Sequence, residues 1–549
     1  MATTWSSQFR SHLTLGGEPL YAVDFVAGAE FRNDDLKEDR YILHSHGGPT
    51  GDHHMGHAVS RVTGSGQSVS LRSWKSSAGG LRVELSGADV AQFVARAIPR
   101  GMIAQLKIGF QGMEFSEWGT VGLYQFRGLS GSRNSWSMDF NDALSSLQSI
   151  PGAHLSAQFM KEAGSTTVIS GLTSLGSAPV LPAATSFLRD SGVGSYGLLL
   201  VSPHEGTDPY YAFVTSASGA SSPIVVAERN AIGTTYQALS SGDTLTSMGY
   251  VDGDVPEIMQ KILFGGLAGA ASMPANWHLG VKYGSDGVHS SDLSAWRTLW
   301  LTEYESFEAD FITAEPVTNP YRSLEEFLSA FGSWLVIKEG GLSWRFVQAI
   351  VPYGDHGAYS VTPAHEITDQ DIAGEETYDL YHSDCPVEYY SVRYAGRSTY
   401  WYDSPSGTGT GTDPSAFRFD HESSGVVYDQ GSLYVGGDPS TTGTTNRDNA
   451  SANIRQRLTP WYTRIPDSMK LVLAGWKFAD LVPGDVVSLK SDYIYNMINR
   501  ATDGVLGSSL GGTRTHDGTL YMVTAVNVDW DGFTVNVELS TPPYSETRF

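Results

Sequence analysis

The densest group of side chains able to do chemistry lies in residues 44–57, which read HSHGGPTGDHHMGH. Neutral imidazoles and a carboxylate are ligands that suit Zn²⁺ or a similar ion. Four glycines and a proline in the same fourteen residues favour a flexible polar loop, which is the simplest interpretation. Whether this loop binds a metal, or packs its histidines on a neighbouring subunit, stays open from the sequence. The candidate ligands are His44, His46, Asp52, His53, His54 and His57.

The histidine loop resembles the HxHxDH motif of metallo-β-lactamase-type hydrolases, but the spacing differs. Five residues separate His46 from Asp52, and no second ligand motif is evident elsewhere in the chain. We therefore predict no metal site, no cofactor and no catalytic residue. A β-rich metal-dependent hydrolase is kept as an alternative interpretation.

Other residues of catalytic type have simpler explanations. The acid pairs Glu325/Glu326 and Glu303/Glu305 could flank a glycosidic bond, but adjacent acids on a capped helix usually interact with the helix dipole. The loop 202–208 holds serine, histidine and acidic residues side by side, whereas a catalytic triad converges from separate places. The sequence therefore predicts that the protein is not an enzyme.

Length and composition bound the fold class. The 549 residues suggest about three to five domains of ordinary size. Sixty-one glycines, with 11% aromatic and only 17% charged residues, are typical of turn-rich β structure and not of helical bundles or disorder. We predict a mainly β, multidomain protein with several small antiparallel barrels or sandwiches and a few short helices.

Charge and apolar pattern limit the partners. A net charge of −24 at pH 7 repels phosphate, which argues against nucleic-acid or anionic-membrane binding through a basic face. The N-terminus lacks the apolar run of a signal peptide, and no stretch approaches the roughly 18 apolar residues of a membrane span. Cys385 is the one cysteine, so an intrachain disulfide or a CxxC site is excluded. These features predict assembly in a cytoplasm, no sequence-specific nucleic acid and no stable membrane binding.

Two β-rich domains are expected in the first half, at 1–150 and 151–250. The first contains a predicted helix over 88–97, whose apolar residues share one face. Its predicted strands cover 19–26, 81–85, 103–110 and 121–126. In the second, apolar runs recur at 197–201, 210–214 and 223–227, a spacing that favours a small barrel or sandwich.

Residues 251–380 are expected to form an α+β middle domain with second barrel elements. Asp254 is the predicted N-cap of a helix that ends at Gly265. Ser323 and Glu326 have capping-box spacing, so a second helix is predicted over 323–332. A hairpin follows, with strands at 334–337 and 342–346.

Residues 381–549 are expected to form a closing β domain with a strand at 389–394. A polar helix over 447–458 precedes PGDVV at 483–487, where a Pro-Gly turn leads into a strand. Asp531-Gly532 predicts a two-residue turn within a hairpin, and segment 471–540 closes as three or four antiparallel strands. The helix arginines, Arg455 and Arg457 among them, are expected to face solvent or a subunit. The Gly/Thr-rich stretches at 403–414 and 436–446 are expected to be loops.

Three of these parts resemble the baseplate hub, or tail-tip attachment, proteins of tailed bacteriophages. PGDVV and YMVTAVNVDWDGFTVNVEL are similar to their closing domain. SLEEFLSAFG followed by WLVIKEGGLSWR resembles their middle domain. GTVGLYQFRGLSG followed by WSMDFNDALSSLQ resembles their first barrel domain. The three parts follow one another in the order found in that family.

The resemblance implies a structural virion protein at the tail tip, assembled in the host cytoplasm. Such a hub joins the hexameric distal tail ring to a threefold tip, holds the end of the tape-measure protein and opens for DNA ejection. The implied partners are two further copies in a homotrimer, the distal tail protein, the tape-measure protein and tail-tip fibre or spike proteins.

A carbohydrate- or receptor-binding tail protein is the second interpretation. Tyr400, Trp401 and Tyr402 lie beside a Gly/Thr-rich stretch and could stack on sugar rings. A strand end packed in an interface is the simpler role for these three residues.

Overall fold

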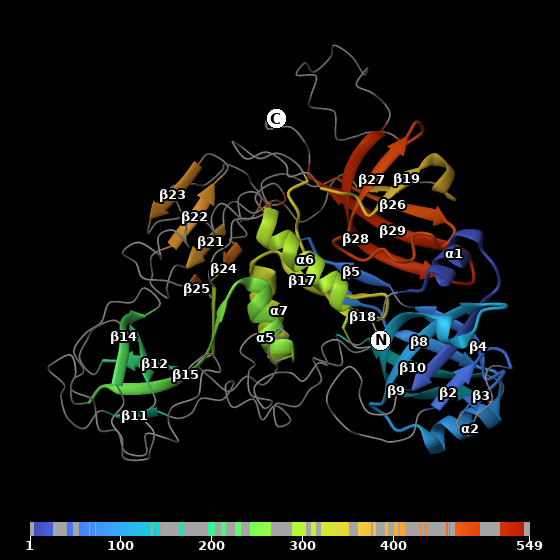
Figure 1. Cartoon of the computed structure of the whole chain (residues 1–549), viewed down its shortest axis with the longest axis horizontal. Coiled ribbons are helices and arrows are strands. Elements are labelled where there is room, and N and C mark those ends of the chain that lie inside the picture. The colour runs from blue at the N-terminus through green and yellow to red at the C-terminus, as the bar shows by residue number, and fades with distance from the viewer. Residues whose placement is uncertain are drawn as a thin grey trace, which may run out of the picture.

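A computed structural model describes the greater part of the chain. The described residues are 5–25, 41–47, 54–64, 66–71, 73–132, 135–142, 144, 165–167, 196–203, 210–215, 225–231, 242–264, 288–303, 309–313, 320–350, 361–374, 377–379, 390–393, 400–404, 407–411, 428–430, 434–435, 457–458, 461, 467–494 and 516–542. Strands dominate, helices are short, and the strands form several separate sheets (Figure 1). The predicted mainly β, multidomain fold is confirmed, and the strand pairings described leave each sheet open.

The N-terminal sheet has the strand order β3-β2-β1-β8-β9-β10-β7-β4. All neighbours are antiparallel except β2 and β3, and helix α2 (Ala88–Ala97) packs on the sheet through Ala91 and Val94. The four strands and the helix predicted here are confirmed. The strands are β1 (Pro19–Phe25), β2 (Tyr41–His44), β3 (His54–Met55), β4 (Val59–Gly64), β7 (Leu81–Leu85), β8 (Ile103–Phe110), β9 (Gly119–Ser132) and β10 (Ser135–Asp142).

Helix α1 (Ser7–Leu15) is not predicted from the sequence. Ser6 caps it by accepting a hydrogen bond from the Phe9 amide, and Phe9 and Leu13 are buried. The helix lies beside the closing sheet at one side of the molecule (Figure 1). Its weak amphipathic pattern, with only two buried residues in nine, explains why periodicity does not reveal it.

A second sheet has the order β14-β13-β12-β15-β16-β25, with β11 paired to β15. The strands predicted at 197–201, 210–214 and 223–227 are confirmed as β12, β13 and β14. Residues 204–208 lie outside the described part. The strands are β11 (Ser165–Thr167), β12 (Tyr196–Ser202), β13 (Tyr210–Thr215), β14 (Val225–Ala231), β15 (Thr244–Gly253), β16 (Ala309–Thr313) and β25 (Tyr434–Val435).

The middle unit packs α5 (Val255–Phe264), α6 (Ser290–Glu303) and α7 (Pro320–Ala330) around the hairpin β17–β18 (Ser333–Lys338 and Gly341–Phe346). Asp254 caps α5 as predicted, accepting from the Glu257 amide at 2.7 Å. The capping box is wrong, because α7 begins at Pro320 and Ser323 lies inside it. Helix α6 is missed by the sequence.

The closing sheet has the order β19-β27-β28-β29-β26-β20. The predicted hairpin is β28–β29, but its turn is wrong: four residues, not two, separate the paired Asp529 and Thr534. The Asp529 side chain accepts from the Asp531 and Gly532 amides, and Phe533 has a left-handed φ of 55°. The strands are β19 (His365–Thr368), β20 (Thr377–Asp379), β26 (Asp467–Ala474), β27 (Val486–Ser491), β28 (His516–Asp529) and β29 (Thr534–Thr541).

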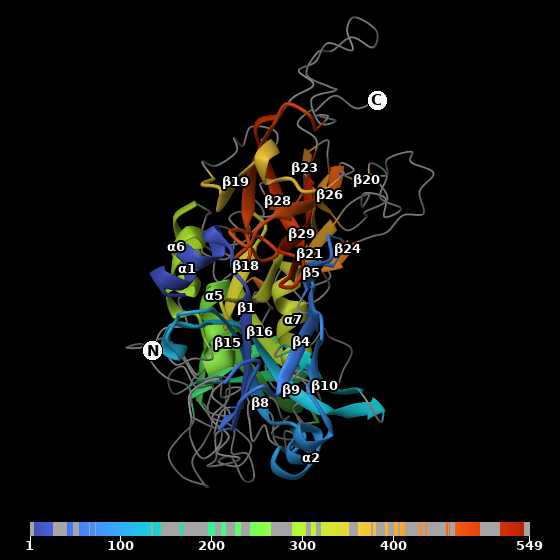
Figure 2. The same cartoon turned by 90° about the vertical axis from the view of Figure 1, so that its right-hand side faces the viewer.

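The closing sheet is larger than the expected three or four strands because it recruits distant segments. Strands β5 (Gln67–Val69) and β6 (Ser76–Ala78) leave the N-terminal sheet, and β5 pairs with β28. Figure 2 shows the blue strands rising from the N-terminal sheet to the red closing sheet.

A four-stranded sheet has the order β23-β22-β21-β24. The predicted strand at 389–394 is confirmed as β21. The loop expected over 403–414 is wrong in part, because strand β23 lies within it and pairs with β22. Residues 436–446 and most of the helix predicted over 447–458 lie outside the described part. The strands are β21 (Tyr390–Arg393), β22 (Tyr400–Ser404), β23 (Gly407–Gly411) and β24 (Tyr428–Gln430).

The central apolar core is shared between units. It unites α5, α6, α7 and the β17–β18 hairpin with Trp74 from the first 150 residues and with Val486 and Met522 of the closing sheet. Burial of this surface stabilises the units together, at roughly 25 cal/mol per Å² of apolar area. None of the helices described is long and apolar enough to cross a membrane.

Candidate functional site

Histidines from neighbouring strands meet at the edge of the N-terminal sheet. His44 ends β2 and is fully buried, and His54 begins β3 beside it. The His44 Nε2 and His54 Nδ1 atoms are 3.2 Å apart, and the two rings stack. His46 stacks on Trp118, whose ring also meets His44 edge to face. The polar-loop interpretation is therefore wrong for His44, which belongs to a packed aromatic cluster.

Backbone contacts join the residues that follow β2 to the residues that follow β3. The His57 amide donates to the His46 carbonyl at 3.0 Å, and a Cβ on Gly56 would lie 3.1 Å from that same carbonyl oxygen. A side chain at this position would require the neighbouring backbone to shift by a few tenths of an ångström. His57 is exposed and has a left-handed φ of 52°. Asp52 and His53 lie outside the described residues.

The buried histidines are kept neutral. Burial, followed by His54 and His46, lowers the pKa of His44 to about 4, although Asp24 opposes the shift. Burial and then His57 lower the pKa of His46. The Nδ1 atoms of His44 and His46 are buried without a hydrogen-bond partner among the residues that the structure describes. A proton added to His44 would therefore place a charge among aromatic rings that Asp24 compensates only in part.

Neutral imidazole nitrogens can bind transition metals, and a structural zinc site takes four ligands. Within the part of the chain that the structure describes, no group of three or more His, Cys, Asp or Glu side chains is placed to hold a metal ion. The described histidines therefore make no metal centre by themselves, and the expectation of no metal stays a prediction for the whole segment.

A second group of ionisable residues lies where the middle unit meets the closing sheet. Arg345 in β18 has a side chain that is 1% exposed. Its Nε donates to Asp485 Oδ1 at 2.8 Å, and its Nη1 donates to Asp292 Oδ2 at 2.6 Å. Asp485 belongs to the PGDVV turn and Asp292 to the first turn of α6. One arginine thus ties a helix and a turn to the hairpin between them.

The PGDVV turn brings the closing sheet against the hairpin. Gly484 has a φ of 103°, and a Cβ there would lie 2.8 Å from both Arg345 Cβ and the Trp334 ring. Any other residue would force the turn away from the hairpin. The Trp334 indole N–H donates to the Pro483 carbonyl at 3.1 Å, which fixes the same approach.

Lys338 belongs with Arg345, Asp292 and Asp485 to one group of ionisable residues, which we call the charged junction. Its Nζ lies 3.3 Å from Asp485 Oδ2 and also donates to the Asp480 carbonyl. Burial lowers the pKa of Lys338, but Asp485 and Asp480 outweigh it and hold the pKa above its usual value. Asp480 also pairs with His365 Nε2 at 2.7 Å. Burial would raise the pKa of Asp480, but this hydrogen bond and Lys338 lower it to about 2.

Glu339 brings the N-terminal helix into the same junction. It sits in the β17–β18 turn with a left-handed φ of 47°, and its side chain is 2% exposed. It accepts from the Trp5 amide at 2.8 Å, pairs with Arg10 and lies 3.4 Å from His289 Nε2. Burial would raise its pKa, but His289, the Trp5 amide and Arg10 hold the pKa below its usual value.

Arg457 corrects one expectation. The sequence predicts that Arg457 faces solvent or a subunit, but its side chain is fully buried within the chain. Its guanidinium lies 4.2 Å from the Trp300 ring centroid, and its Nη1 donates to the Phe331 carbonyl at 3.0 Å. The other arginines of that segment lie outside the described residues.

The remaining candidates are not brought together as an active site. Glu326 pairs with Arg322 one turn away, at 3.1 Å on an exposed face. Glu303 ends α6, while Glu305 and Cys385 lie outside the described residues. Tyr400, Trp401 and Tyr402 lie in strand β22.

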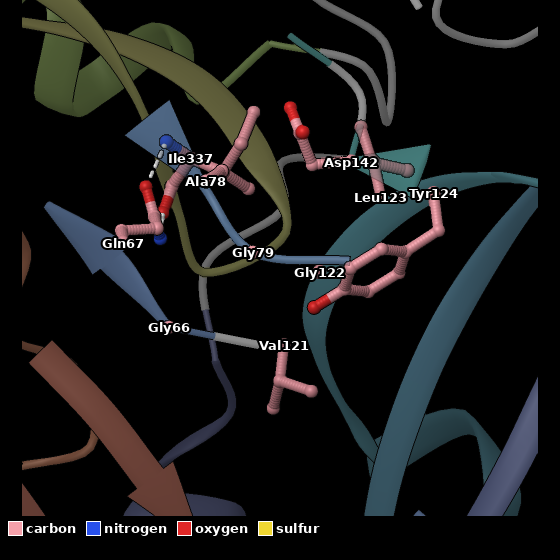
Figure 3. Close-up of a pocket in the computed structure, with 10 residues that line it drawn as sticks. All are labelled: Gly66, Gln67, Ala78, Gly79, Val121, Gly122, Leu123, Tyr124, Asp142 and Ile337. Atoms are coloured by element: carbon pink, nitrogen blue, oxygen red, sulfur yellow. Dashed lines mark hydrogen bonds between the residues drawn. The ribbon is translucent and has the colours of Figure 1, made fainter. Parts of the chain in front are cut away.

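A small hollow lies between the N-terminal sheet and the β5–β6 hairpin (Figure 3). Its volume of about 20 Å³ has room for about one water molecule. Its lining is Gly66, Gln67, Ala78, Gly79, Val121, Gly122, Leu123, Tyr124, Asp142 and Ile337. The hollow is a gap in packing and is too small for a substrate.

The charged junction escapes sequence analysis because its members are far apart in the chain. Arg345 and Asp485 are separated by 140 positions, and Trp5 and Glu339 by 334. The one local signal is the Glu339-Gly340 turn, whose two left-handed residues favour a tight hairpin.

Fold and site together define a class: a mainly β, multidomain protein whose units are joined by buried ion pairs. No family model matches the sequence, and no curated protein matches it. The chain is similar to the solved 43 kDa tail protein of prophage MuSo2 from Shewanella oneidensis, with 9% identity and a TM-score of 0.28, over 87% of this chain and 94% of that one.

Two further solved structures are similar to the chain at the same low level. Prophage tail protein gp18 from Listeria monocytogenes EGD-e is 8% identical with a TM-score of 0.30, over 96% of each chain. A chain of the virion of a native gene transfer agent particle is 13% identical with a TM-score of 0.18, over 44% of this chain and 83% of that one.

Proposed function

We propose that this chain is a structural protein of a bacteriophage tail that acts as the central hub at the tail tip. The observation that carries the proposal is that the three segments resembling phage hub proteins touch at one junction. Arg345 of the WLVIKEGGLSWR hairpin pairs with Asp485 of PGDVV. The tip of the same hairpin packs on β9 of the first segment, where a Cβ on Gly340 would lie 2.3 Å from the Thr120 side chain.

The chemistry of the junction suits a structural role. Arg345, Lys338 and Glu339 each have partners of opposite charge within the chain. Buried charges of this kind resist separation, because removing one partner leaves the other unpaired in a low-dielectric surrounding. Groups committed in this way hold units at fixed positions and are not free to act on a substrate.

Under this proposal three copies form a homotrimeric hub in the virion. The hub joins the hexameric distal tail ring to a threefold tip, holds the end of the tape-measure protein and opens for DNA ejection. The distal tail protein, the tape-measure protein and tail-tip fibre or spike proteins are its proposed partners. The sequence resemblance in three collinear parts and the interlocked junction support this role.

Light scattering on the purified full-length chain tests the trimer. The proposal predicts a solution mass three times the 59.2 kDa of one chain. A mass of one chain at every concentration tested would contradict a homotrimeric hub.

A further inference from the structure

One segment crosses from the N-terminal sheet into both other units. Strands β4 and β7 pair in the N-terminal sheet, and the same ribbon continues as β5 and β6 in the closing sheet. We call residues 66–79, which carry β5 and β6, the strap. Three of its contacts lie with residues more than 250 positions away in the chain.

The first contact of the strap is with the closing sheet. β5 pairs antiparallel with β28, with Ser68 opposite Ala525 and Gln67 opposite Val526. The register of β28 against β29 shifts between Val523 and Ala525, immediately beside this pairing. A bulge of this kind bends a strand. Here the bend lies where the strap adds to the sheet.

In the second contact, the Gln67 side chain makes a pair of hydrogen bonds to the backbone of β17, as a neighbouring strand would. The Gln67 amide accepts from the Ile337 backbone N–H at 2.9 Å and donates to the Ile337 carbonyl at 2.8 Å (Figure 3). One amide thus satisfies both backbone groups of a residue on the free edge of β17. Because Ile337 is buried, loss of the amide would leave its polar groups without these partners.

The third contact is an anchor in the central core. Trp74 is fully buried, stacks on Trp334 at 5.8 Å and meets Trp461 edge to face at 5.7 Å. Trp74 also has a left-handed φ of 50°, which is rare for a bulky residue. Packing of the indole into the middle unit therefore holds a backbone conformation that the strap alone would not favour.

Glycines form a narrow neck between the strap and its own sheet. Gly64 has a φ of 99°, and a Cβ there would lie 2.3 Å from the Gly80 carbonyl oxygen. A Cβ on Gly80 would lie 2.7 Å from the Phe140 carbonyl oxygen. The Gly79 amide donates to the Gly66 carbonyl at 2.6 Å. The neck is therefore closely packed, and it joins the strap to the paired strands β4 and β7 of the N-terminal sheet.

We propose that the strap is a latch that, alongside the contacts of Trp5 and Arg10 with Glu339, holds the N-terminal sheet to the middle and closing units, and that its withdrawal loosens this attachment. The withdrawal step rests on the proposed function, in which the hub opens for DNA. The contacts to be broken are the β5–β28 pairing, the Gln67 amide pair and the Trp74 anchor. All three join the strap to the middle or the closing unit.

Hydrogen-exchange mass spectrometry on the full chain tests the latch. Gln67→Met keeps the length of the side chain and removes both hydrogen bonds to Ile337. We expect peptides covering Ile337 and Val526 to exchange about tenfold faster. Gln105→Met, the same change at a buried glutamine of β8, is the matched control and should leave both peptides unchanged.

Trp74→Phe provides the second variant and should speed exchange in the same two peptides while the N-terminal sheet stays protected. The latch is contradicted if both variants keep wild-type exchange at Ile337 and Val526. Equal acceleration across all three units would also contradict it, because that pattern indicates general destabilisation.

A cross-link separates the latch from the proposed function. Ser68→Cys with Ala525→Cys, in a Cys385→Ser background, places two thiols on directly opposite residues. Oxidation should slow exchange at Val526 in the isolated protein, whatever its biological role. In phage particles carrying this variant, oxidation should block DNA release and reduction should restore it. Normal release from oxidised particles would overturn the withdrawal step alone, whereas absence of the chain from the particles would overturn the proposed function.

Discussion

The histidine cluster and the charged junction both bury ionisable side chains, but they balance charge in opposite ways. His44 is kept neutral by burial among aromatic rings, and its Nδ1 has no partner. Arg345 is kept charged by two carboxylates within 2.8 Å. Protonation of His44 therefore destabilises the histidine cluster. The charged junction is destabilised when one member of an ion pair is removed. We therefore expect acid sensitivity at the edge of the N-terminal sheet, and we expect the junction to hold the units together.

The largest expected effect is at the junction. Arg345→Met keeps much of the side-chain volume but leaves Asp292 and Asp485 buried without their arginine. We expect the free energy of unfolding in urea to fall by about 3–5 kcal/mol. The matched control is Arg322→Met, whose side chain is 69% exposed beside Glu326 and whose loss should change stability by less than about 0.5 kcal/mol. Equal effects of the two variants would erase the contrast between the junction and the surface.

The next effect belongs to the histidine cluster and depends on pH. His44 titrates near pH 6.5 when unfolded and near 4 when folded, so the unfolded chain takes up the proton first. The free energy of unfolding should therefore fall by about 3 kcal/mol as the pH drops from 6.5 to 4. His44→Gln should flatten the profile in this window, as measured by urea denaturation at a series of pH values.

His57→Asn is the control for the cluster, since His57 is exposed and asparagine tolerates its left-handed backbone. This variant should retain the pH dependence that comes from His44, because His57 shifts the pKa of His46 and not that of His44. If His44→Gln also retained it, the acid sensitivity would lie elsewhere in the molecule.

Asp480 is expected to give a smaller effect on stability, at a lower pH than His44. The pKa of Asp480 is lowered to about 2 from 3.8, so its contribution is complete above pH 3.8 and is lost as the pH falls towards 2. Asp480→Asn should lower the free energy of unfolding at pH 7 by about 2 kcal/mol and remove the loss between pH 4 and 2. Thermal unfolding followed by circular dichroism measures both, with Glu366→Gln as an exposed control. Stability unchanged at pH 7 would show that Asp480 does not support the junction.

Local patterns reveal much of the fold. Helix α5 is predicted from its Asp254 cap, and β17–β18 from two short apolar and aromatic runs around a Glu-Gly-Gly turn, because both signals lie within a few residues. Helix α7 is predicted, but it begins three residues earlier than expected, because its first residue is Pro320 and not Ser323. Helix α6 and helix α1 give weak periodic signals and are missed.

Long-range placement explains the remaining errors. Arg457 reads as a surface residue because neither Trp300 nor the Phe331 carbonyl is near it in sequence. His44 reads as part of a polar loop because its glycine neighbours outweigh the apolar strand before it. The contacts of the strap are not predicted for the same reason. Nothing in the sequence of residues 66–79 indicates that Trp74 packs against Trp334 and Trp461.

Immunogold electron microscopy can test whether this chain has the proposed place in a phage tail. Antibodies raised against the full chain would be applied to purified tailed particles whose genome encodes it. If the chain is the hub at the tail tip, gold label is expected at the tip of each tail. Label along the tail shaft would contradict the hub, and particles without label or without the chain in their protein composition would contradict the whole account.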